Sequence, residues 1–320
     1  MSARGGIDLG GTKIQAVVVD DKHEVLGDSR RPTPHEGGPQ DVADAMAETV
    51  RDAAKAAGLE PGALAGIGVG SPGAVDDGAG TVTSARNLPG WEGSFDLATS
   101  LSSALGPIVR LGNDVQVATD AEFALGAAKD SSSLLGVFWG TGVGGGLVLD
   151  GEPWLGRGAA GEIGHMVVRR GGAHCTCGRR GCMEAYAGRA AMEITARHKH
   201  EDGAKTDLFK IMEKRGRDRL TSGIWARALK REDKLATSLI ERAVRALGAG
   251  VASAVNLLDV EAVVIGGGLG TRLGAPYVER IEEAMGPHLF MSDRPPVVSV
   301  AALGDLGGAI GAALLSGATP

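Results

Sequence analysis

Residues 6–21 read GIDLGGTKIQAVVVDD, and residues 136–151 read GVFWGTGVGGGLVLDG. Each stretch has an apolar segment, a glycine-rich turn and a second apolar segment that ends at aspartate, which is the pattern of a β-hairpin. At one constant offset the two stretches match at five positions: Gly6 with Gly136, Gly10 with Gly140, Ala16 with Gly146, Val18 with Val148, and Asp20 with Asp150. A repeat at half the chain length indicates a duplicated domain rather than a solenoid.

The segments around the hairpins predict alternating strands and helices. In the first half we expect a third strand after Asp21, strands in LAGIGVGSPGAV and PIVRLGND, and helices over 40–57, over 95–105 and from Asp114. In the second half we expect helices over 184–232, 233–258, 276–286 and 306–317, and strands in EAVVIGGG and over 296–302.

This order of elements predicts an α/β fold with mixed sheets, divided into two domains around a ligand cleft. The predicted domains are a small one over 1–128 plus 306–320 and a larger one over 129–305.

Composition excludes several classes of protein. The chain has 320 residues, of which 43% are apolar and 22% charged, and its net charge is −6. No apolar run is long enough to span a membrane, and the N-terminus enters a strand without a signal-peptide pattern, so we expect a cytoplasmic protein. The acidic balance argues against broad nucleic-acid binding.

All three cysteines lie in GGAHCTCGRRGCMEAYAG, residues 171–188. A reducing compartment and an odd count argue against disulfides, and the glycine-rich surroundings argue against three buried apolar thiols. Cys175, Cys177 and Cys182 would need a fourth ligand to complete a tetrahedral zinc site. His165, in the strand-like run GEIGHMVV, is the better candidate, because His174 adjoins Cys175 directly. A closed site of this kind is structural.

The two hairpins also indicate phosphate binding, because glycine lets backbone N–H groups approach anionic oxygens. GTGVGG, residues 140–145, fits the G-x-G-x-x-G pattern of dinucleotide-binding loops. That pattern must open a helix, whereas this stretch continues as a strand, so we do not expect a dinucleotide fold.

Six motifs resemble the ROK family of bacterial sugar kinases and related repressors. They are DLGGTK, NLPGW, GND, GTGVGGG, GEIGH and CTCGRRGCME, and the resemblance runs from residue 5 to about 315. The resemblance implies two ribonuclease-H-like domains of the actin/hexokinase type around a central cleft.

The resemblance also implies a sugar site with structural zinc. The implied sugar-binding residues are Asn87, Asn113, Asp114, Glu162, His165 and Glu184. The implied zinc ligands are His165, Cys175, Cys177 and Cys182. Asp114 is the expected general base, since a carboxylate can take the proton of the attacking sugar hydroxyl. Asp114 could also serve as the N-cap of the helix that follows it, and both roles are compatible.

For the phosphates, the resemblance implies that Asp8 positions Mg²⁺ and that three glycine-rich segments hold ATP. These segments are Gly10, Gly11, Thr12 and Lys13; Gly140, Thr141 and Gly142; and Gly266, Gly267 and Gly268 near the adenosine. Two alternatives stay open: Lys13 could be a solvated strand lysine, and residues 266–268 could be a plain turn between a strand and a helix.

The expected activity is ATP-dependent phosphorylation of a hexose, with glucose first and N-acetylmannosamine, fructose or allose as alternatives. Inorganic polyphosphate is an alternative donor. A sugar-responsive regulator is disfavoured because DLGGTK starts at residue 8, and a silent sugar-binding module is disfavoured by Asp8 and Asp114. We expect a homodimer or homotetramer. The charged segment 198–232 fits the family poorly, and we expect a solvated pair of helices there.

Overall fold

The computed structural model describes residues 2–85 and 88–317. The chain forms two compact units: the first comprises Met1–Lys129, Leu155–Gly158 and Ala302–Pro320, and the second comprises Asp130–Trp154 and Ala159–Ala301. Residues 129, 155–158 and 302–305 therefore lie in the first unit, whereas the sequence-based division placed them in the larger domain.

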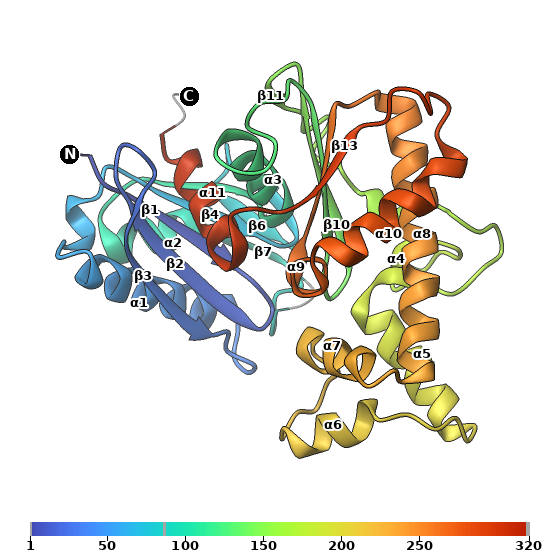
Figure 1. The fold of residues 1–320 in the computed structure, drawn as a ribbon. Helices are drawn as coiled ribbons and strands as arrows, with labels where there is room; N and C mark the ends of the chain where they lie inside the picture. The colour runs from blue at the N-terminus through green and yellow to red at the C-terminus, as the bar shows by residue number, and fades with distance from the viewer. Residues whose placement is uncertain (1, 86–87, 318–320) are drawn as a thin grey trace. The chain divides into compact units, whose positions relative to one another are not determined.

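The first unit is built on a five-stranded mixed sheet in the order β3-β2-β1-β4-β8 (Figure 1). Its strands are β1 (Arg4–Leu9), β2 (Lys13–Val19), β3 (Val25–Pro32), β4 (Ile67–Ser71) and β8 (Val109–Asn113). The first three strands pair antiparallel, as the predicted meander requires, and β4 and β8 run parallel to β1. A small sheet of β5 (Ala74–Asp76), β6 (Thr81–Thr83) and β7 (Ser94–Asp96) was not predicted.

Helices cover both faces of this sheet. They are α1 (Pro39–Ala56), α2 (Leu97–Leu105), α3 (Asp114–Ala124) and α11 (Gly307–Leu315), and a short 3₁₀ helix, η1 (Pro61–Ala63), precedes β4. Helix α1 packs on β2 and β3, while α11 packs on β1, β4 and α3. Gly6 and Gly68 allow α11 to lie directly on the strands, because a Cβ at either position would overlap the helix backbone at Ala309 or Ala312.

The second unit repeats the first sheet in the order β11-β10-β9-β12-β13. Its strands are β9 (Leu134–Trp139), β10 (Val143–Leu149), β11 (Glu152–Pro153), β12 (Ala262–Gly266) and β13 (Val297–Val300). The directions match as well: β9, β10 and β11 pair antiparallel in sequence order, and β12 and β13 run parallel to β9. The duplication predicted from the hairpins is thus present in the topology of both sheets.

The two hairpins differ by one residue in register. Gly6 pairs with Val17, whereas Gly136 pairs with Gly146, so the turn of the first hairpin is one residue longer. The Gly10 N–H accordingly donates to the Lys13 carbonyl at 2.9 Å, whereas the Gly140 N–H donates to Gly142 at 3.0 Å. The constant offset in the sequence does not reveal this difference.

Seven α-helices follow the hairpin in the described part of the second unit. They are α4 (Glu184–Ala187), α5 (Arg189–Glu201), α6 (Leu208–Lys214), α7 (Ser222–Lys230), α8 (Lys234–Leu258), α9 (Gly267–Leu273) and α10 (Ala275–Met285). Short 3₁₀ helices are η2 (Ile163–His165), η3 (Gly286–His288) and η4 (Gly304–Leu306), of which η4 belongs to the first unit. The sequence predicted α8 and α10 closely but missed α9.

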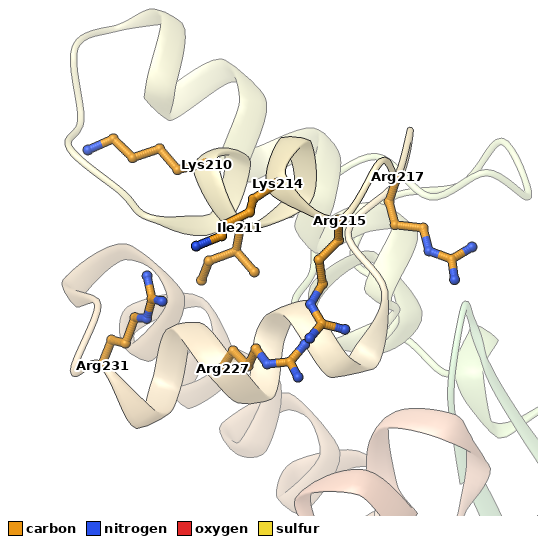
Figure 2. A pocket seen from close by; sticks show the side chains of 7 residues that line it. All are labelled: Lys210, Ile211, Lys214, Arg215, Arg217, Arg227 and Arg231. Atoms are coloured by element: carbon orange, nitrogen blue, oxygen red, sulfur yellow. The ribbon is translucent and has the colours of Figure 1, made fainter.

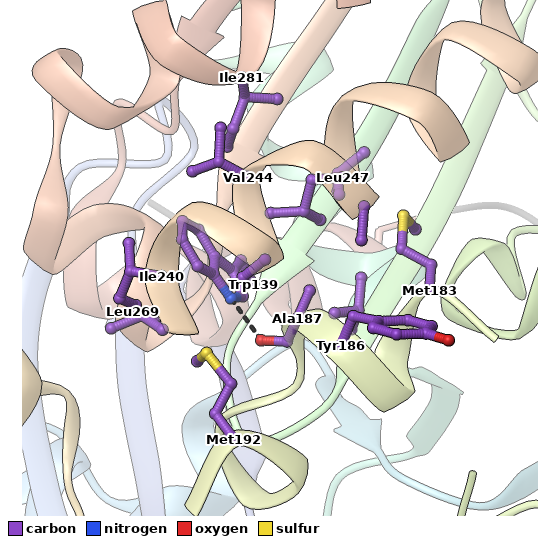
Figure 3. Close-up of a cluster of buried hydrophobic side chains, with 14 of the residues drawn as sticks. Trp139, Met183, Tyr186, Ala187, Met192, Ile240, Val244, Leu247, Leu269 and Ile281 are labelled. Carbon is purple, nitrogen blue, oxygen red and sulfur yellow. Dashed lines mark hydrogen bonds between the residues drawn. The ribbon is translucent and has the colours of Figure 1, made fainter. Parts of the chain in front are cut away.

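A buried tryptophan ties the sheet of the second unit to its helices. Trp139, at the end of β9, is fully buried, and its Nε1 donates to the Ala187 carbonyl at 2.7 Å (Figure 3). Apolar side chains of α8, including Ile240, Val244 and Leu247, belong to the same buried cluster. Burial of apolar area at this scale is the main favourable contribution to folding.

None of the helices formed by residues 2–85 and 88–317 combines the length and the apolar character needed to cross a bilayer.

Glu122 in α3 is a buried carboxylate that the sequence analysis missed. Its Oε2 accepts from the N–H groups of Ala127 and Ala302, both at 2.9 Å, and its Oε1 accepts from Leu303 at 2.9 Å. Ala127 lies just before the chain leaves the first unit, and Ala302 and Leu303 lie just after it returns. Glu122 therefore anchors two connecting segments to one helix.

We expect Glu122→Gln to destabilise the protein by about 1.5–3 kcal/mol, because an amide accepts through one oxygen only and leaves at least one of the three N–H groups without its charged acceptor. Urea unfolding of this variant, compared with Glu36→Gln at an exposed site of the same unit, measures the effect. Equal unfolding free energies in the two variants would contradict the anchoring role.

Candidate functional site

The polar residues of the first unit gather at the carboxyl ends of its parallel strands. Asp8 pairs with Gly70, and Ser71 pairs with Asn113, so β1, β4 and β8 end together. Ligand sites in α/β sheets occur at this edge. The structure therefore brings Asp8 of DLGGTK and the Asn-Asp pair of GND to one side of the sheet.

Asn113 performs the capping role considered for Asp114. The Asn113 Oδ1 accepts from the N–H groups of Val115 at 3.1 Å and Gln116 at 3.2 Å, which makes it the N-cap of α3. Asp114 is instead the first residue of the helix, and its Oδ1 lies 3.0 Å from the Val115 nitrogen. The N-cap reading of Asp114 was wrong by one residue, because the strand continues to Asn113.

Asp8 lies in an environment suited to a cation. Burial raises the pKa of its carboxyl, the positive charge of Lys13 lowers it, and the negative charge of Asp305 raises it further. A Cβ at Gly308, in the first turn of α11, would lie 2.9 Å from the Asp8 Cγ. Carboxylate oxygens are the hard ligands that Mg²⁺ prefers, so Asp8, whose carboxyl senses the charge of Asp305, fits a magnesium ion.

Lys13 is half-buried, and its Nζ donates to the Gln15 Oε1 at 2.6 Å. Gln15 pairs with Asp8 in the ladder between β1 and β2, so the three residues share one face of the sheet. The solvated-lysine alternative therefore does not describe this side chain. Gln15 was missed, although an amide within the apolar run IQAVVV was the sequence signal that could have revealed it.

Asp120, two turns along α3, has a pKa raised to about 7, because it is buried; a hydrogen bond from the Gln116 Nε2 to its Oδ1 at 2.6 Å partly opposes the shift. A carboxyl whose folded-state pKa lies above its unfolded value of 3.8 destabilises the folded protein once it ionises. This loss of unfolding free energy is absent at low pH, where Asp120 is protonated in both states, and it grows as the pH rises from about 4 to about 7.

We expect Asp120→Asn to raise the free energy of unfolding by about 1–3 kcal/mol at pH 8, because the amide removes the buried charge and can still accept from Gln116. Urea unfolding at pH 8 and at pH 4.5 measures the difference. An equal gain at both pH values would show that Asp120 titrates normally.

In the second unit, the His165, Cys175, Cys177 and Cys182 ligand atoms lie within 4.8 Å of one another. The Cys177 and Cys182 sulfurs are 3.7 Å apart, and the His165 Nδ1 is 3.7 Å from the Cys175 sulfur. Tetrahedral zinc with bonds of about 2.3 Å to sulfur separates its ligand atoms by about 3.8 Å, whereas a disulfide needs about 2.05 Å. The cluster therefore fits zinc and not a disulfide.

The loop that holds the cysteines is a tight turn. Val167 and Cys182 form an isolated bridge, and Gly181, at φ +84°, would clash with the Arg169 carbonyl if it carried a Cβ. His174 points to Arg180 and is not part of the cluster. GEIGHMVV does not form the strand-like run expected from sequence, because His165 ends the 3₁₀ helix η2.

The thiol pKa values shift in opposite directions within the cluster. A hydrogen bond with the Arg179 backbone is the main cause that lowers the pKa of Cys177. Burial, followed by the neighbouring thiols, raises the pKa of Cys182 to about 12. A bound divalent cation would reverse the second effect, because metal ligation requires the thiolate.

Two glutamates join this cluster to its surroundings. The Glu162 Oε2 lies 3.8 Å from the His165 Nε2, the ring nitrogen on the side away from the sulfurs. Glu184 accepts from the Val143 N–H at 3.0 Å and from the Thr176 hydroxyl at 3.3 Å. Glu184 thus connects the cysteine loop to the hairpin of β9 and β10.

The glycine segments of the second unit also come together. A Cβ at Gly140 would lie 3.8 Å from the Gly268 nitrogen, so the hairpin turn adjoins the start of α9. Gly266 is the N-cap of α9, so residues 266–268 form both a turn and a helix start. Arg189 fixes the hairpin, because its guanidinium donates to the Thr141 hydroxyl at 2.7 Å and its N–H to the Gly140 carbonyl at 3.1 Å. Burial lowers the pKa of Arg189.

Among the sequence-based site residues, Asn87 lies outside the described part of the chain. The others fall into two groups. Asp8, Gly10, Gly11, Thr12, Lys13, Asn113 and Asp114 are in the first unit, and the remaining residues are in the second.

A comparison with known families matches residues 4–318 to the family model described as "ROK family". The chain belongs to the ROK family. This ROK protein is 32% identical over 290 residues to the glucokinase of Thermotoga maritima, with 88% of each chain covered. It is 30% identical over 312 residues to an N-acetylmannosamine kinase of Haemophilus influenzae, covering 96% of this chain and 93% of the relative.

Among solved structures, this ROK protein resembles a ROK family glucokinase from Streptomyces griseus in complex with glucose and AMPPNP. The TM-score is 0.84 at 29% identity, and the match covers 98% of this chain and 99% of the other. Together with the repeated sheet order, this similarity confirms the predicted α/β fold with two ribonuclease-H-like domains of the actin/hexokinase type.

Proposed function

We propose that this sugar kinase of the ROK family transfers the terminal phosphoryl group of ATP to a hexose, with glucose as the first candidate. The observation that carries the proposal is the placement of Asp8, Asn113 and Asp114 at one edge of the first sheet. A phosphoryl-transfer site needs a cation-binding carboxylate and a base that orients the attacking hydroxyl, and both kinds of residue are present there.

In this proposal Asp114 accepts the proton of the attacking sugar hydroxyl. The carboxylate lies at the start of α3, where Asn113 caps the helix and fixes the direction of the first turn. A positioned carboxylate raises the nucleophilicity of the hydroxyl as the phosphoryl group moves across. Asn113 and Asp114 of the first unit, with Glu162, His165 and Glu184 of the second, would hydrogen-bond the sugar.

ATP would bind through backbone N–H groups in three glycine-rich segments. These are Gly10, Gly11 and Thr12 with Lys13 in the first unit, and Gly140, Thr141 and Gly142 together with Gly266, Gly267 and Gly268 in the second. Mg²⁺, when held by Asp8, would neutralise charge on the phosphates. Arg189 would keep the second hairpin in place through Thr141.

We infer that His165, Cys175, Cys177 and Cys182 hold a structural zinc ion. The support is the spacing of their ligand atoms. Four protein ligands complete the tetrahedral coordination of zinc and leave no position for a substrate, which is typical of a structural site. The zinc would fix the loop that carries Thr176 and so hold Glu184 toward the sugar.

A coupled assay of the purified protein against glucose, mannose, fructose, allose and N-acetylmannosamine, with ATP and separately with inorganic polyphosphate, tests the proposal. We expect the highest kcat/KM for glucose with ATP. A preference for N-acetylmannosamine would move the substrate to the second candidate, which the relative of Haemophilus influenzae favours. No turnover of any sugar with either donor would overturn the kinase assignment.

A further inference from the structure

A cavity of about 560 Å³ lies between α6 and α7 of the second unit, in the charged segment that the proposed function does not use. Figure 2 shows the side chains around it. The lining consists of one apolar residue and six cationic residues: Ile211, Lys210, Lys214, Arg215, Arg217, Arg227 and Arg231. Ile211 is buried, and the six charged side chains are exposed.

The charge of this segment is opposite to that of the protein. Residues 205–231 contain nine Lys and Arg and three Asp and Glu, which gives a net charge of +6. Because the whole chain carries −6, the rest of the chain carries −12. A local excess of this size creates a positive potential that attracts anions over about a Debye length, roughly 10 Å at 0.1 M salt.

Few carboxylates lie close enough to neutralise the six cationic side chains that line the cavity. Across residues 2–85 and 88–317, Asp207 alone lies within ion-pair distance of the lining cations, 3.8 Å from the Lys210 Nζ and 3.5 Å from an Arg231 nitrogen. Lys214, Arg215, Arg217 and Arg227 have no such carboxylate among those residues. The cluster therefore keeps most of its charge available.

The cationic side chains also converge. In Figure 2, the side chains of Lys214, Arg215, Arg227 and Arg231 point toward the space between the two helices, and all four line the same cavity. Like charges four residues apart, as at Lys210 and Lys214 in α6, destabilise a helix. Favourable interaction with the helix C-terminus accounts for Lys214 and Arg227 in the last turns of α6 and α7 and for the C-cap residues Arg215 and Arg231, but not for Lys210 and Arg217.

We propose that this cavity, the α6–α7 site, binds a small anion that carries several phosphate groups. Four of the six cations are arginines, whose guanidinium groups bind phosphate oxygens in pairs. The volume falls in the range of small-molecule sites, about 300–1,000 Å³. The strongly acidic remainder of the chain disfavours a long nucleic acid, which would extend beyond the cluster.

The α6–α7 site has a physical connection to the proposed ATP segments. One guanidinium nitrogen of Arg189 donates to the Leu220 carbonyl at 2.8 Å, and another donates to the Thr141 hydroxyl at 2.7 Å. Leu220 immediately precedes Thr221, the N-cap of α7. An anion that shifts α7 is therefore expected to change the KM for ATP. This regulatory step rests on the proposed function, whereas anion binding itself does not.

Titration calorimetry with inorganic tripolyphosphate in magnesium-free buffer tests the site. We compare the parent with Arg215→Gln/Arg227→Gln and with a matched control, Lys205→Gln/Lys230→Gln, which removes two exposed charges of the same segment outside the cavity. We expect the first pair to weaken binding at least about tenfold and the control pair less than about twofold, because charge-assisted contacts are lost only in the first. Unfolding midpoints verify that both variants fold.

Each outcome separates the alternatives. Equal losses of tripolyphosphate affinity in the two double variants would show that binding depends on the overall charge of the segment and not on the cavity, and would overturn the proposal. The absence of binding by the parent at low salt would overturn it as well. Tighter binding of a single-stranded oligonucleotide than of tripolyphosphate through Arg215 and Arg227 would overturn the small-anion assignment. A second titration with a hexose bisphosphate, compared with that of tripolyphosphate, shows which of these two classes of phosphate compound the site binds more tightly. If no sugar is phosphorylated but the variant-dependent binding persists, the kinase proposal fails and this one stands.

Discussion

Asp114→Asn is expected to lower kcat for hexose phosphorylation by about 10²- to 10⁴-fold, equivalent to roughly 3–5 kcal/mol of transition-state stabilisation. The amide keeps the size of the side chain and an oxygen that can accept hydrogen bonds, but it cannot take the proton of the attacking hydroxyl. Asn113 caps α3, so the substitution leaves the cap intact. The fold and the sugar affinity should therefore change little.

The measurement is kcat by the coupled assay and the Kd for glucose by titration on the same preparation. Asp120→Asn is the matched control, because it removes a second carboxylate from the same helix. We expect the control to keep kcat within about twofold of the parent. Turnover of Asp114→Asn within about threefold of the parent would place the base elsewhere and remove the central step of the proposed mechanism.

The sequence predicted the fold well where periodicity and turn chemistry act locally. The hairpins at residues 6–21 and 136–151 form as expected, and their duplication extends to the whole order of both sheets. Apolar alternation and glycine turns are local signals, which is why they can be read without a structure. The residues of the cysteine cluster were likewise predicted from spacing and composition.

Features that depend on distant contacts could not be predicted. The three short strands β5, β6 and β7 pair only because the chain folds back between residues 76 and 94. Glu122 accepts hydrogen bonds from backbone groups some 180 residues away in the sequence, and a single glutamate within a helix gives no sign of that. The helix α9 begins within three glycines, which local propensity assigns to a turn.

The candidate site was predicted as a set of residues but not as a geometry. The sequence could not show which histidine nitrogen faces the thiols, or that Glu162 lies near the other nitrogen. It also misplaced the helix cap at Asp114, because a boundary between a strand and a helix is uncertain by a residue or more. Side-chain direction follows from packing, which periodicity does not contain.

Cys177→Ser is expected to abolish stoichiometric zinc binding and to lower the stability of the second unit by several kcal/mol. The parent should contain about one zinc per chain, since a closed Cys₃His set binds one ion. Serine matches cysteine in shape but does not supply a thiolate, and apparent binding free energies of structural zinc reach about 10–16 kcal/mol in small domains. Metal analysis and urea unfolding measure the two effects.

The sugar affinity should fall with the zinc, because Glu184 accepts from Thr176 of the same loop and would lose its fixed position. His174→Asn is the matched control: it alters the other histidine of the loop, whose ring contacts Arg180 and not the cysteines. This control should retain zinc, stability and sugar binding. A parent protein without zinc, or a Cys177→Ser variant with unchanged zinc content and stability, would show that the four residues do not form a structural metal site.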